Sequence, residues 1–240
     1  MDEVWVARAG LVPYRDALAA QKRLEGARVA GSIPDVLLLL EHPPVYTKGR
    51  RTTPDELPMG EDWYETQGIE VCETDRGGRV TYHGPGQLVG YPIVSLKPYG
   101  DDVHAYIRNM ERVVIGSLAE HDVVAGVIDG LTGVWVENRK IGSIGVHINR
   151  AVTTHGFAVN VANDLQPFEW IVPCGIESCR MTSLTREAGV EQEIDAFAST
   201  VARRFADVYA RRAVEVEGAD LAARVDGLEA LAAPALASLR

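Results

Sequence analysis

The sequence predicts an α/β (α+β) fold in which helices flank a mixed, mostly antiparallel sheet. Segments with the alternation of β-strands often follow one another after short turns, without the regular strand–helix–strand order of a parallel sheet. Two segments, 102–120 and 193–211, repeat apolar residues every three or four positions, which is typical of helices packed on a sheet. No internal repeat or low-complexity linker interrupts the 240 residues. We therefore expect one domain over residues 1–217 and a C-terminal helical tail over 218–240.

The first elements are predicted by proline positions and by aliphatic runs. Proline is favoured in the first turn of a helix, so Pro13 marks the start of a helix that ends near Arg28. The run from Val36 to Leu40 is aliphatic at every position, which indicates a strand buried on both faces. The expected order is a strand at 4–7, a helix at 13–28, a strand at 35–40, an extended path through Pro43 and Pro44 to residue 47, a loop at 50–60 and a strand at 68–73.

The central and C-terminal parts contain most of the expected strands. Asp101 and Asp102 are preferred helix N-cap residues, and they precede the most regular helical pattern in the chain. Asn138-Arg139 is expected as a hairpin turn before a strand that begins at Lys140. The expected elements are strands at 79–82 and 88–96, a helix at 102–120, strands at 123–128, 133–137, 140–148 and 153–161, a helix at 193–211, a strand at 213–217 and one or two helices in the tail.

Composition and charge exclude several classes of protein. A net charge of −10 argues against non-specific binding of nucleic acid. No apolar run approaches the roughly 18–20 residues that span a bilayer, and Met1-Asp2-Glu3 lacks a signal-peptide pattern. We therefore expect a cytoplasmic protein without a membrane partner. The three cysteines, Cys72, Cys174 and Cys179, form neither a paired zinc motif nor a disulfide framework, so no metal site is expected from them.

The stretch 76–87, Arg-Gly-Gly-Arg-Val-Thr-Tyr-His-Gly-Pro-Gly-Gln, is the richest in unusual residues. A short strand pattern is preceded by a glycine pair and followed by a Gly-Pro-Gly turn. Glycine lets the backbone lie close to a ligand, and we expect the glycines at 77, 78, 84, 142, 145 and 156 to let a narrow chain lie along the backbone. The alternative is an ordinary hairpin with an exposed His83.

A second candidate for chemistry is the thiol of Cys174 in Pro-Cys-Gly-Ile. A thiol is a poor nucleophile near neutral pH unless a cation stabilises the thiolate. Lys140 heads an otherwise apolar strand face, where a charge is costly unless it is used or paired, so it is the candidate cation. Two alternatives stay open: Cys174 can be an inert packed thiol, and Lys140 can extend its ammonium to solvent from the strand end. Cys72 and Cys179 are interpreted as structural.

Four stretches together resemble the octanoyltransferase family of lipoate biosynthesis, the lipoyl(octanoyl) transferases. They are Arg-Gly-Gly-x-x-Thr-Tyr-His-Gly-Pro-Gly-Gln at 76–87, Lys-Ile-Gly-Ser-Ile-Gly at 140–145 followed by His-Gly-Phe-Ala-x-Asn at 155–160, Pro-Cys-Gly-Ile at 173–176, and Glu-His-Pro-Pro-Val-Tyr-Thr at 41–47. No single stretch is decisive, but their combination and order are specific. The resemblance indicates that residues 1–217 form the catalytic domain and that its motifs lie at about residues 30–190.

The resemblance implies the fold of biotin and lipoate protein ligases and a transfer reaction. An octanoyl or lipoyl group would pass from acyl carrier protein to a lysine of lipoyl domains, such as the glycine-cleavage H protein and the acyltransferase subunits of 2-oxoacid dehydrogenases. It implies Cys174 as acyl acceptor with Lys140 assisting, and neither a metal nor a cofactor. The residues that it places around the acyl chain are Arg76, Gly77, Gly78, Arg79, Val80, Thr81, Tyr82, His83, Ser143, Ile144, Gly145, Gly156, Phe157 and Ala158.

Three other functions remain open from the sequence. An ATP-dependent lipoate or biotin ligase would form an acyl-adenylate and need no nucleophilic cysteine, but Pro-Cys-Gly-Ile and the Gly-Pro-Gly-Gln after His83 favour the transferase. A cysteine hydrolase would use Cys174 with His83 or His155 and release the free acid. A non-catalytic protein that binds acyl carrier protein or lipoyl domains would gain no covalent octanoyl mass.

Overall fold

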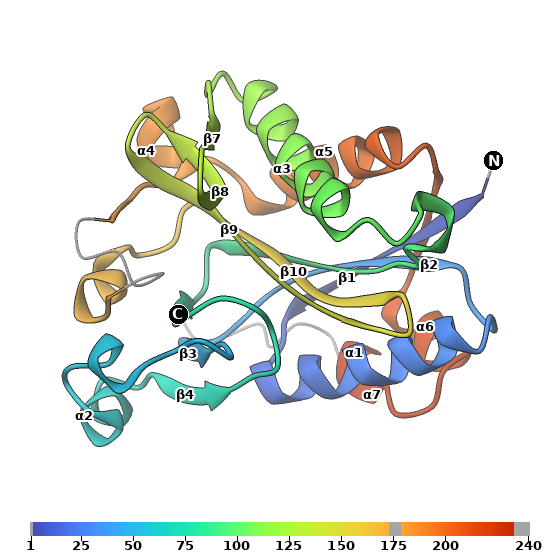
Figure 1. The fold of residues 1–240 in the computed structure, drawn as a ribbon, viewed down its shortest axis with the longest axis horizontal. Coiled ribbons are helices and arrows are strands. Elements are labelled where there is room, and N and C mark those ends of the chain that lie inside the picture. The colour runs from blue at the N-terminus through green and yellow to red at the C-terminus, as the bar shows by residue number, and fades with distance from the viewer. Residues whose placement is uncertain (1, 173–178, 233–240) are drawn as a thin grey trace.

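The computed structural model describes residues 2–172 and 179–232, which form a main sheet, a small second sheet and helices on both sides of the main sheet (Figure 1). The main sheet has nine strands: in spatial order β12 (Arg212–Val216), β1 (Glu3–Leu11), β2 (Asp35–Glu41), β6 (Gln87–Ile93), β10 (Val152–Asn160), β9 (Arg139–Asn149), β8 (Leu131–Val136) and β7 (Gly126–Ile128), with β11 (Arg180–Met181) paired to β9. β1 is parallel to β2 and β12, and β11 is parallel to β9. The other pairs are antiparallel, which confirms a mixed, mostly antiparallel sheet.

The small sheet consists of β4 (Glu70–Glu73), β3 (Val45–Lys48) and β5 (Thr81–His83). The extended path expected after Pro43 and Pro44 is therefore strand β3, which lies between the other two strands. The strand expected at 79–82 begins only at Thr81, because the carbonyl of Arg79 and the amide of Val80 bond to the side chains of Arg76 and Glu56 instead of to a strand.

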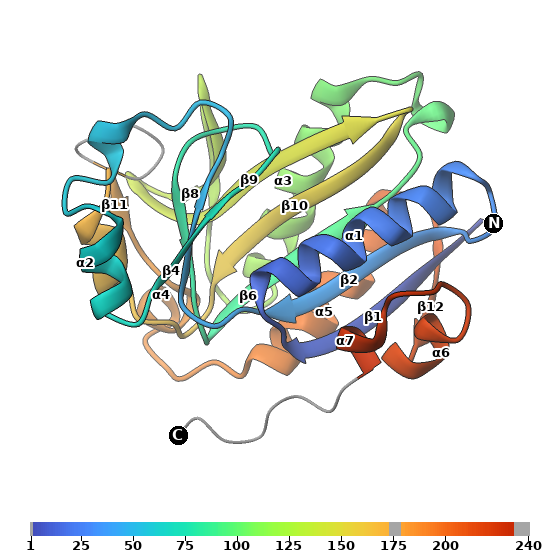
Figure 2. The same cartoon turned by 90° about the horizontal axis from the view of Figure 1, so that it is seen from below.

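Helices cover both faces of the main sheet, and Figures 1 and 2 show which elements lie on each. α3 and α5 lie on one face, and α1, α6, α7 and the small sheet lie on the other. The helices are α1 (Tyr14–Val29), α2 (Glu61–Thr66), α3 (Val103–Ala119), α4 (Leu184–Ala188), α5 (Ile194–Val208), α6 (Gly218–Ala222) and α7 (Glu229–Ala232), with short 3-10 turns at Pro54–Glu56, Lys97–Tyr99 and Gln166–Trp170. None of these helices combines the length and apolar content needed to cross a membrane.

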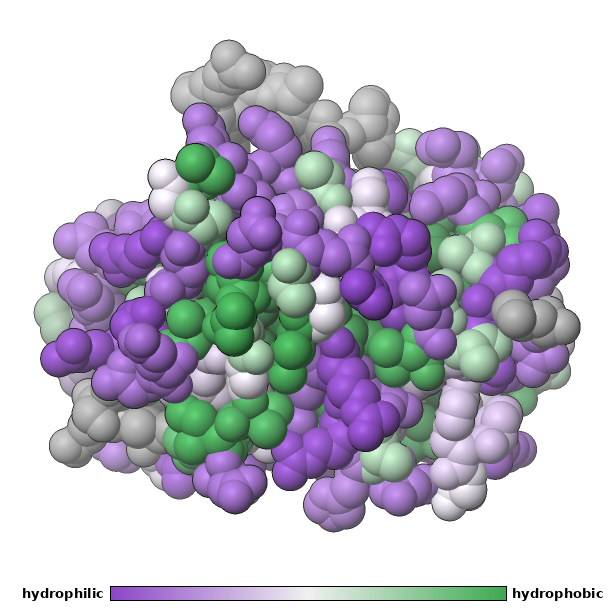
Figure 3. All heavy atoms as spheres, turned by 90° about the horizontal axis from the view of Figure 1, so that it is seen from above, coloured by the Kyte–Doolittle hydropathy of each residue, from purple (hydrophilic) through white to green (hydrophobic). Residues whose placement is uncertain are grey.

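The face covered by α3 and α5 is a continuous apolar core. Asp102 caps α3 as expected, its side chain accepting a hydrogen bond from the amide of Ala105 at 2.9 Å. The side chains of Met110, Val114 and Leu118 on α3 are completely buried against α5 and the sheet. Figure 3 shows the outer surface of this layer, where hydrophilic side chains surround smaller hydrophobic areas, as expected for amphipathic helices.

The C-terminal part of the described chain packs onto the second core. Strand β12 returns beside β1, and α6 and α7 then contact β1 and α1. Leu221 and Leu228 are fully buried in the cluster that includes Leu24 of α1. Residues 218–232 therefore belong to the same hydrophobic core as the N-terminal helix.

Strand β9 contains a bulge at the point where Lys140 enters it. Lys140 and Gly142 pair with the adjacent residues Trp135 and Val134 of β8, so Ile141 is an extra residue without a partner on that strand. Ile141 is completely buried in the core beneath α3. The simple alternation expected from Lys140 onward is therefore interrupted at Ile141.

Candidate active site

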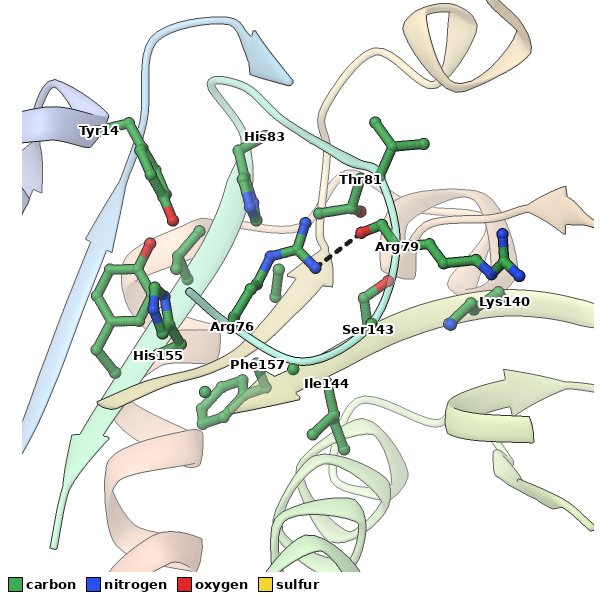
Figure 4. A pocket seen from close by; sticks show the side chains of 17 residues that line it. Tyr14, Arg76, Arg79, Thr81, His83, Lys140, Ser143, Ile144, His155 and Phe157 are labelled. Carbon is green, nitrogen blue, oxygen red and sulfur yellow. Dashed lines mark hydrogen bonds between the residues drawn. The ribbon is translucent and has the colours of Figure 1, made fainter. Parts of the chain in front are cut away.

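A cavity lies between the main sheet, α1 and the loop that leads into β5 (Figure 4). It holds about 520 Å³ of space not filled by atoms, part of it open to solvent. In Figure 4 Tyr14 and His155 lie at one end, and Lys140 and Arg79 lie at the other. The lining residues are Tyr14, Arg76, Gly78, Arg79, Val80, Thr81, His83, Val89, Tyr91, Lys140, Ser143, Ile144, Gly145, His155, Gly156, Phe157 and Ala158.

Most of the residues expected around an acyl chain line this cavity, although they come from three separate parts of the sequence. Two of them do not. Tyr82 lies in an aromatic cluster with Tyr46 and Phe168, because the pleat of β5 turns it away from its neighbours Thr81 and His83. Gly77 lines an adjoining cavity.

The loop from Arg76 to Arg79 is held by the side chain of Arg76, which is 7% exposed. One terminal nitrogen donates to the carbonyl of Arg79 at 2.8 Å, and the other donates to the carbonyl and hydroxyl of Thr47 at 2.6 and 2.7 Å. The amide of Gly77 donates to the carbonyl of Val146 on β9 at 2.9 Å. The guanidinium therefore replaces the ladder bonds that this segment lacks, and the loop forms a fixed wall of the cavity.

Two glycines of the motifs, Gly145 and Gly156, let protein elements approach one another closely. A Cβ at Gly156 would lie 2.2 Å from the carbonyl oxygen of Gly90 on β6. A Cβ at Gly145 would lie 3.0 Å from the carbonyl oxygen of Gly77. The missing side chains of Gly145 and Gly156 therefore let the glycine loop approach β9 and let β6 approach β10, and both glycines also line the cavity.

Two buried histidines near the Tyr14 end are fixed in one neutral tautomer each. His42 contacts the carbonyl of Val12 through Nδ1 at 2.6 Å and the hydroxyl of Tyr91 through Nε2 at 2.7 Å. A carbonyl can only accept, so Nδ1 carries the proton and the Tyr91 hydroxyl donates to Nε2. Burial lowers the pKa of His42 to about 4, with the Val12 bond opposing the shift.

His83 is held in the same way. Its Nδ1 donates to the side-chain oxygen of Gln87 at 2.7 Å, and its Nε2 lies 3.4 Å from the hydroxyl of Thr47. Burial lowers the pKa of His83 well below its usual value, and the neighbouring His42 adds to the shift. Both ring nitrogens are engaged by protein groups, which favours a wall residue over a proton relay.

His155 joins the cavity to helix α1 through Asp75. Its Nε2 donates to Asp75 at 2.7 Å, and Lys22 of α1 donates to the same carboxylate at 2.5 Å. The hydrogen bond from His155 holds the pKa of Asp75 far below its ordinary value, although partial desolvation opposes this. Burial lowers the pKa of His155 against the pull of Asp75, so the pair is a neutral imidazole donating to a carboxylate. His155 has φ of +57°, a backbone strain that its surroundings maintain.

Lys140 lies at the opposite end of the cavity and is 3% exposed. Its Nζ donates to the carbonyl of Thr132 at 3.1 Å and lies 5.3 Å from the centre of the Trp135 ring. The ammonium is therefore buried beside the cavity, and the alternative in which it extends to solvent is wrong. Such a cation can stabilise a neighbouring thiolate.

Cys174 lies outside the described residues, whereas the chain on either side of it is described. Met181 pairs with Lys140 in the β11–β9 ladder, and the amide of Thr182 donates to the carbonyl of Lys140 at 2.9 Å. Cys174 precedes Met181 by seven residues in the sequence. The amide of Val172, on the other flank, donates to the carbonyl of Glu56 at 3.0 Å.

Cys72 differs from a reactive thiol. It is 2% exposed, and burial raises its pKa to about 12, with the bond to Glu70 adding to the shift. This agrees with its interpretation as a structural residue. Cys179 is half-buried and contacts the sulfur of Met181. Within residues 2–172 and 179–232, no group of three or more His, Cys, Asp or Glu side chains could hold a metal ion.

Four lining residues were not predicted from the sequence: Tyr14, Val89, Tyr91 and His155. Tyr14 falls in the helix expected at 13–28, and the topology brings it to the cavity from a distant part of the chain. His155 was considered only as a partner for the cysteine of a hydrolase, but it follows directly in the motif that places Gly156 and Phe157. That adjacency is a signal that could have identified it.

Comparison with known proteins gives one family and one fold. A profile of the lipoyl protein ligase A/B catalytic domain matches residues 13–206. The chain is 47% identical over 200 residues to an octanoyltransferase of Solibacter usitatus, covering 83% of this chain and 90% of the relative. It is 48% identical over 200 residues to an octanoyltransferase of Mycobacterium tuberculosis, covering 82% and 83%.

Solved structures show the same fold at low sequence identity. A putative lipoate protein ligase of T. acidophilum, Ta0514, superposes with a TM-score of 0.72 at 17% identity, covering 97% of this chain and 92% of that one. A lipoate-protein ligase A bound with ATP superposes with a TM-score of 0.68 at 18% identity, covering 97% and 93%. The expected ligase-like fold is therefore confirmed.

Proposed function

Because this chain belongs to the lipoyl protein ligase A/B catalytic-domain family and is an octanoyltransferase, we propose that it moves octanoyl through a thioester on Cys174. The donor is octanoyl acyl carrier protein, and the acceptor is a lysine of a lipoyl domain, such as those of the glycine-cleavage H protein and the 2-oxoacid dehydrogenase acyltransferase subunits. The observation that carries this proposal is a cavity that ends at a buried lysine, on the strand paired with the chain just after Cys174.

The reaction has two steps. The thiolate of Cys174 attacks the thioester carbonyl, the carbon–sulfur bond to the carrier breaks, and the departing carrier thiolate takes up the proton that the Cys174 thiol gave up on ionising. The acceptor amine then attacks the carbonyl of the new thioester, the carbon–sulfur bond to Cys174 breaks as the amide forms, and the proton that the amine loses passes to the freed Cys174 thiolate. Lys140 assists by favouring the thiolate in both steps. The exchange of one thioester for another needs no ATP, and the final amide is more stable than either thioester.

The cavity supplies the binding energy that positions the acyl chain. Phe157, Ile144 and Val80 give it apolar walls. Burying the methylenes of an octanoyl chain at about 0.8 kcal/mol each gives roughly 5 kcal/mol. That energy can hold the carbonyl against Lys140 while the tail extends toward Tyr14.

An ATP-dependent ligase is the less supported alternative. The relatives that are 44–49% identical are octanoyltransferases, whereas the lipoate-protein ligase with bound ATP is 18% identical and shows the fold alone. A nucleophilic cysteine also has no role in a reaction that proceeds through an adenylate.

The proposal is tested by the intact mass of the protein after incubation with octanoyl acyl carrier protein, without ATP. We expect one octanoyl group on Cys174, which disappears when a lipoyl domain is added and reappears on that domain. Peptide mapping distinguishes Cys174 from Cys72 and Cys179. Transfer that requires ATP would establish a ligase instead, and free octanoate as the only product would establish a hydrolase.

A further inference from the structure

A second cavity adjoins the first at Lys140. Gly78, Arg79, Lys140, Ile144 and Gly145 line both cavities. The second cavity contains about 1010 Å³ of space not filled by atoms, part of it open to solvent. Its remaining walls come from α3, the β7–β8 turn, β8, β9 and the segments at Arg51 and Gly77; these residues are Arg51, Gly77, Ile107, Gly130, Leu131, Thr132, Trp135 and Val146.

The charged side chains that the described residues contribute to this second cavity are all positive. Among residues 2–172 and 179–232, its ionisable lining residues are Arg51, Arg79 and Lys140, and none of the lining residues there is a carboxylate. Arg79 is paired with the buried carboxylate of Glu56. Arg51 is exposed, and its guanidinium makes no hydrogen bond or ion pair with residues 2–172 or 179–232. A wall of this charge attracts an anionic ligand and repels the ammonium of an incoming lysine side chain.

The walls also suit a ligand that carries amides. Ile107, Leu131 and Val146 provide apolar surface on which a narrow chain can lie. Trp135 lines the cavity and is 4% exposed, and its indole N–H has no acceptor in the described part of the chain. A buried donor without a partner is costly, and an amide carbonyl of a ligand would satisfy it.

We propose that the second cavity receives the arm of the acyl donor, a slender amide-bearing chain that joins the thioester sulfur to a phosphate. Arg51 binds the phosphate, Trp135 donates to an amide carbonyl, and the thioester lies at Lys140 where the two cavities meet. The acyl tail then occupies the first cavity and the arm occupies the second. This inference rests on the proposed octanoyl transfer, and it identifies the part of the donor that the protein recognises beside the acyl group.

Arg51 is the residue to test, because its removal leaves no buried partner behind. Replacing Arg79 would instead strand the carboxylate of Glu56, which is 1% exposed. The matched control is Arg50→Ala, since the neighbouring Arg50 points to His147 at 3.1 Å and does not line the second cavity.

The experiment measures kcat/KM with three donors: octanoyl-pantetheine, which lacks the phosphate, octanoyl-phosphopantetheine, and octanoyl acyl carrier protein. We expect Arg51→Ala to lower kcat/KM about tenfold for both phosphate-bearing donors and less than about twofold for octanoyl-pantetheine. Arg51→Lys, which keeps the charge, should recover most of the loss. Arg50→Ala should affect all three donors equally and by less than about twofold.

Three results would overturn the assignment. They are an equal loss on all donors, no loss on any donor, and a loss confined to the carrier protein, which would place Arg51 against the protein surface of the carrier. Failure of the proposed function has a different signature, because the unmodified protein would then transfer octanoyl from none of the three donors.

Discussion

The two faces of the main sheet bury different kinds of side chain. α3 and α5 cover most of one face, where apolar residues such as Met110 and Val113 are completely buried, and the second cavity lies beside Ile107 of α3. On the other face α1 covers one part and the small sheet covers another. The cavity lies between these two covers, and Arg76, His83 and His155 are buried there among hydrogen-bond partners.

The two faces of the main sheet therefore contribute to different properties: one mainly to stability and the other mainly to activity. A closed apolar face contributes burial and little chemistry, whereas a gap between two covers can hold buried polar groups and admit a ligand. Changes on the α3 side should therefore affect the free energy of unfolding, and changes around the cavity should affect transfer. The following predictions test that separation in order of decreasing effect.

Cys174→Ser should lower octanoyl transfer by about a thousandfold or more, because a serine hydroxyl is a far weaker nucleophile toward a thioester at neutral pH. The measurement is transfer to a lipoyl domain together with binding of octanoyl carrier protein, which should persist. Cys72→Ser, at a buried site outside the cavity, is the control and should retain Cys174 acylation. Robust transfer by the Cys174 variant would rule out the covalent route.

Met110→Ala should lower the free energy of unfolding by about 2–5 kcal/mol, since the side chain is completely buried between α3, α5 and the sheet. Urea unfolding measures this change, and kcat/KM per folded molecule should stay within about twofold of the original. Val124→Ala, at an 89% exposed position, is the control and should change stability by less than about 0.5 kcal/mol. A large loss of kcat/KM in the folded Met110 variant would show that the closed face also shapes the reaction.

Lys140→Ala should lower transfer by about a hundredfold, because the ammonium no longer favours the thiolate. The specific readout is the rate of Cys174 alkylation by iodoacetamide against pH, followed by peptide mapping. The profile should move to higher pH in the variant and stay unchanged in the control Lys97→Ala, at an exposed site. An unchanged Lys140→Ala profile would mean that Lys140 contributes in another way.

His42→Gln should flatten the pH dependence of stability in acid. Burial lowers the pKa of His42 to about 4 in the folded state, so the unfolded chain takes up a proton first as the pH falls. The stabilisation is complete above about pH 6.5 and is lost progressively down to about pH 4, amounting to about 2 kcal/mol between pH 7 and pH 5.

Urea unfolding at several pH values measures this slope for the unmodified protein and the variant. The exposed His104 provides the matched control, since His104→Gln should leave the slope unchanged. If the free energy of unfolding of His42→Gln falls in acid as much as that of the unmodified protein, other groups near the cavity cause the pH dependence.

Much of the fold could be predicted because periodicity reports burial directly. The helix that became α3 was expected within one residue at each end, and its cap was expected from Asp102. Helix α2 was missed, because a helix of six residues after a proline-rich loop has too few turns to show a period. The order of the strands, including the parallel pairing of β1 with β12, depends on distant contacts that no local pattern contains.

Prediction of the candidate active site was limited in the same way, because local sequence patterns do not contain distant contacts. Residues contiguous with a motif, such as Thr81 and Phe157, were expected at the cavity and line it. Tyr14 could not be assigned, because only the packing of α1 over β10 and the link through Asp75 bring it there. Tyr82 was included by adjacency, although the two-residue period of a strand turns it to the opposite side.

The guanidinium of Arg76 has a consequence for how a substrate is received. Since it already bonds to the carbonyls of Arg79 and Thr47, the glycine loop has lost its conformational entropy during folding. An entering hydrocarbon finds a preorganised wall, so none of its binding energy goes to ordering that segment, and an induced-fit step at this loop is unnecessary.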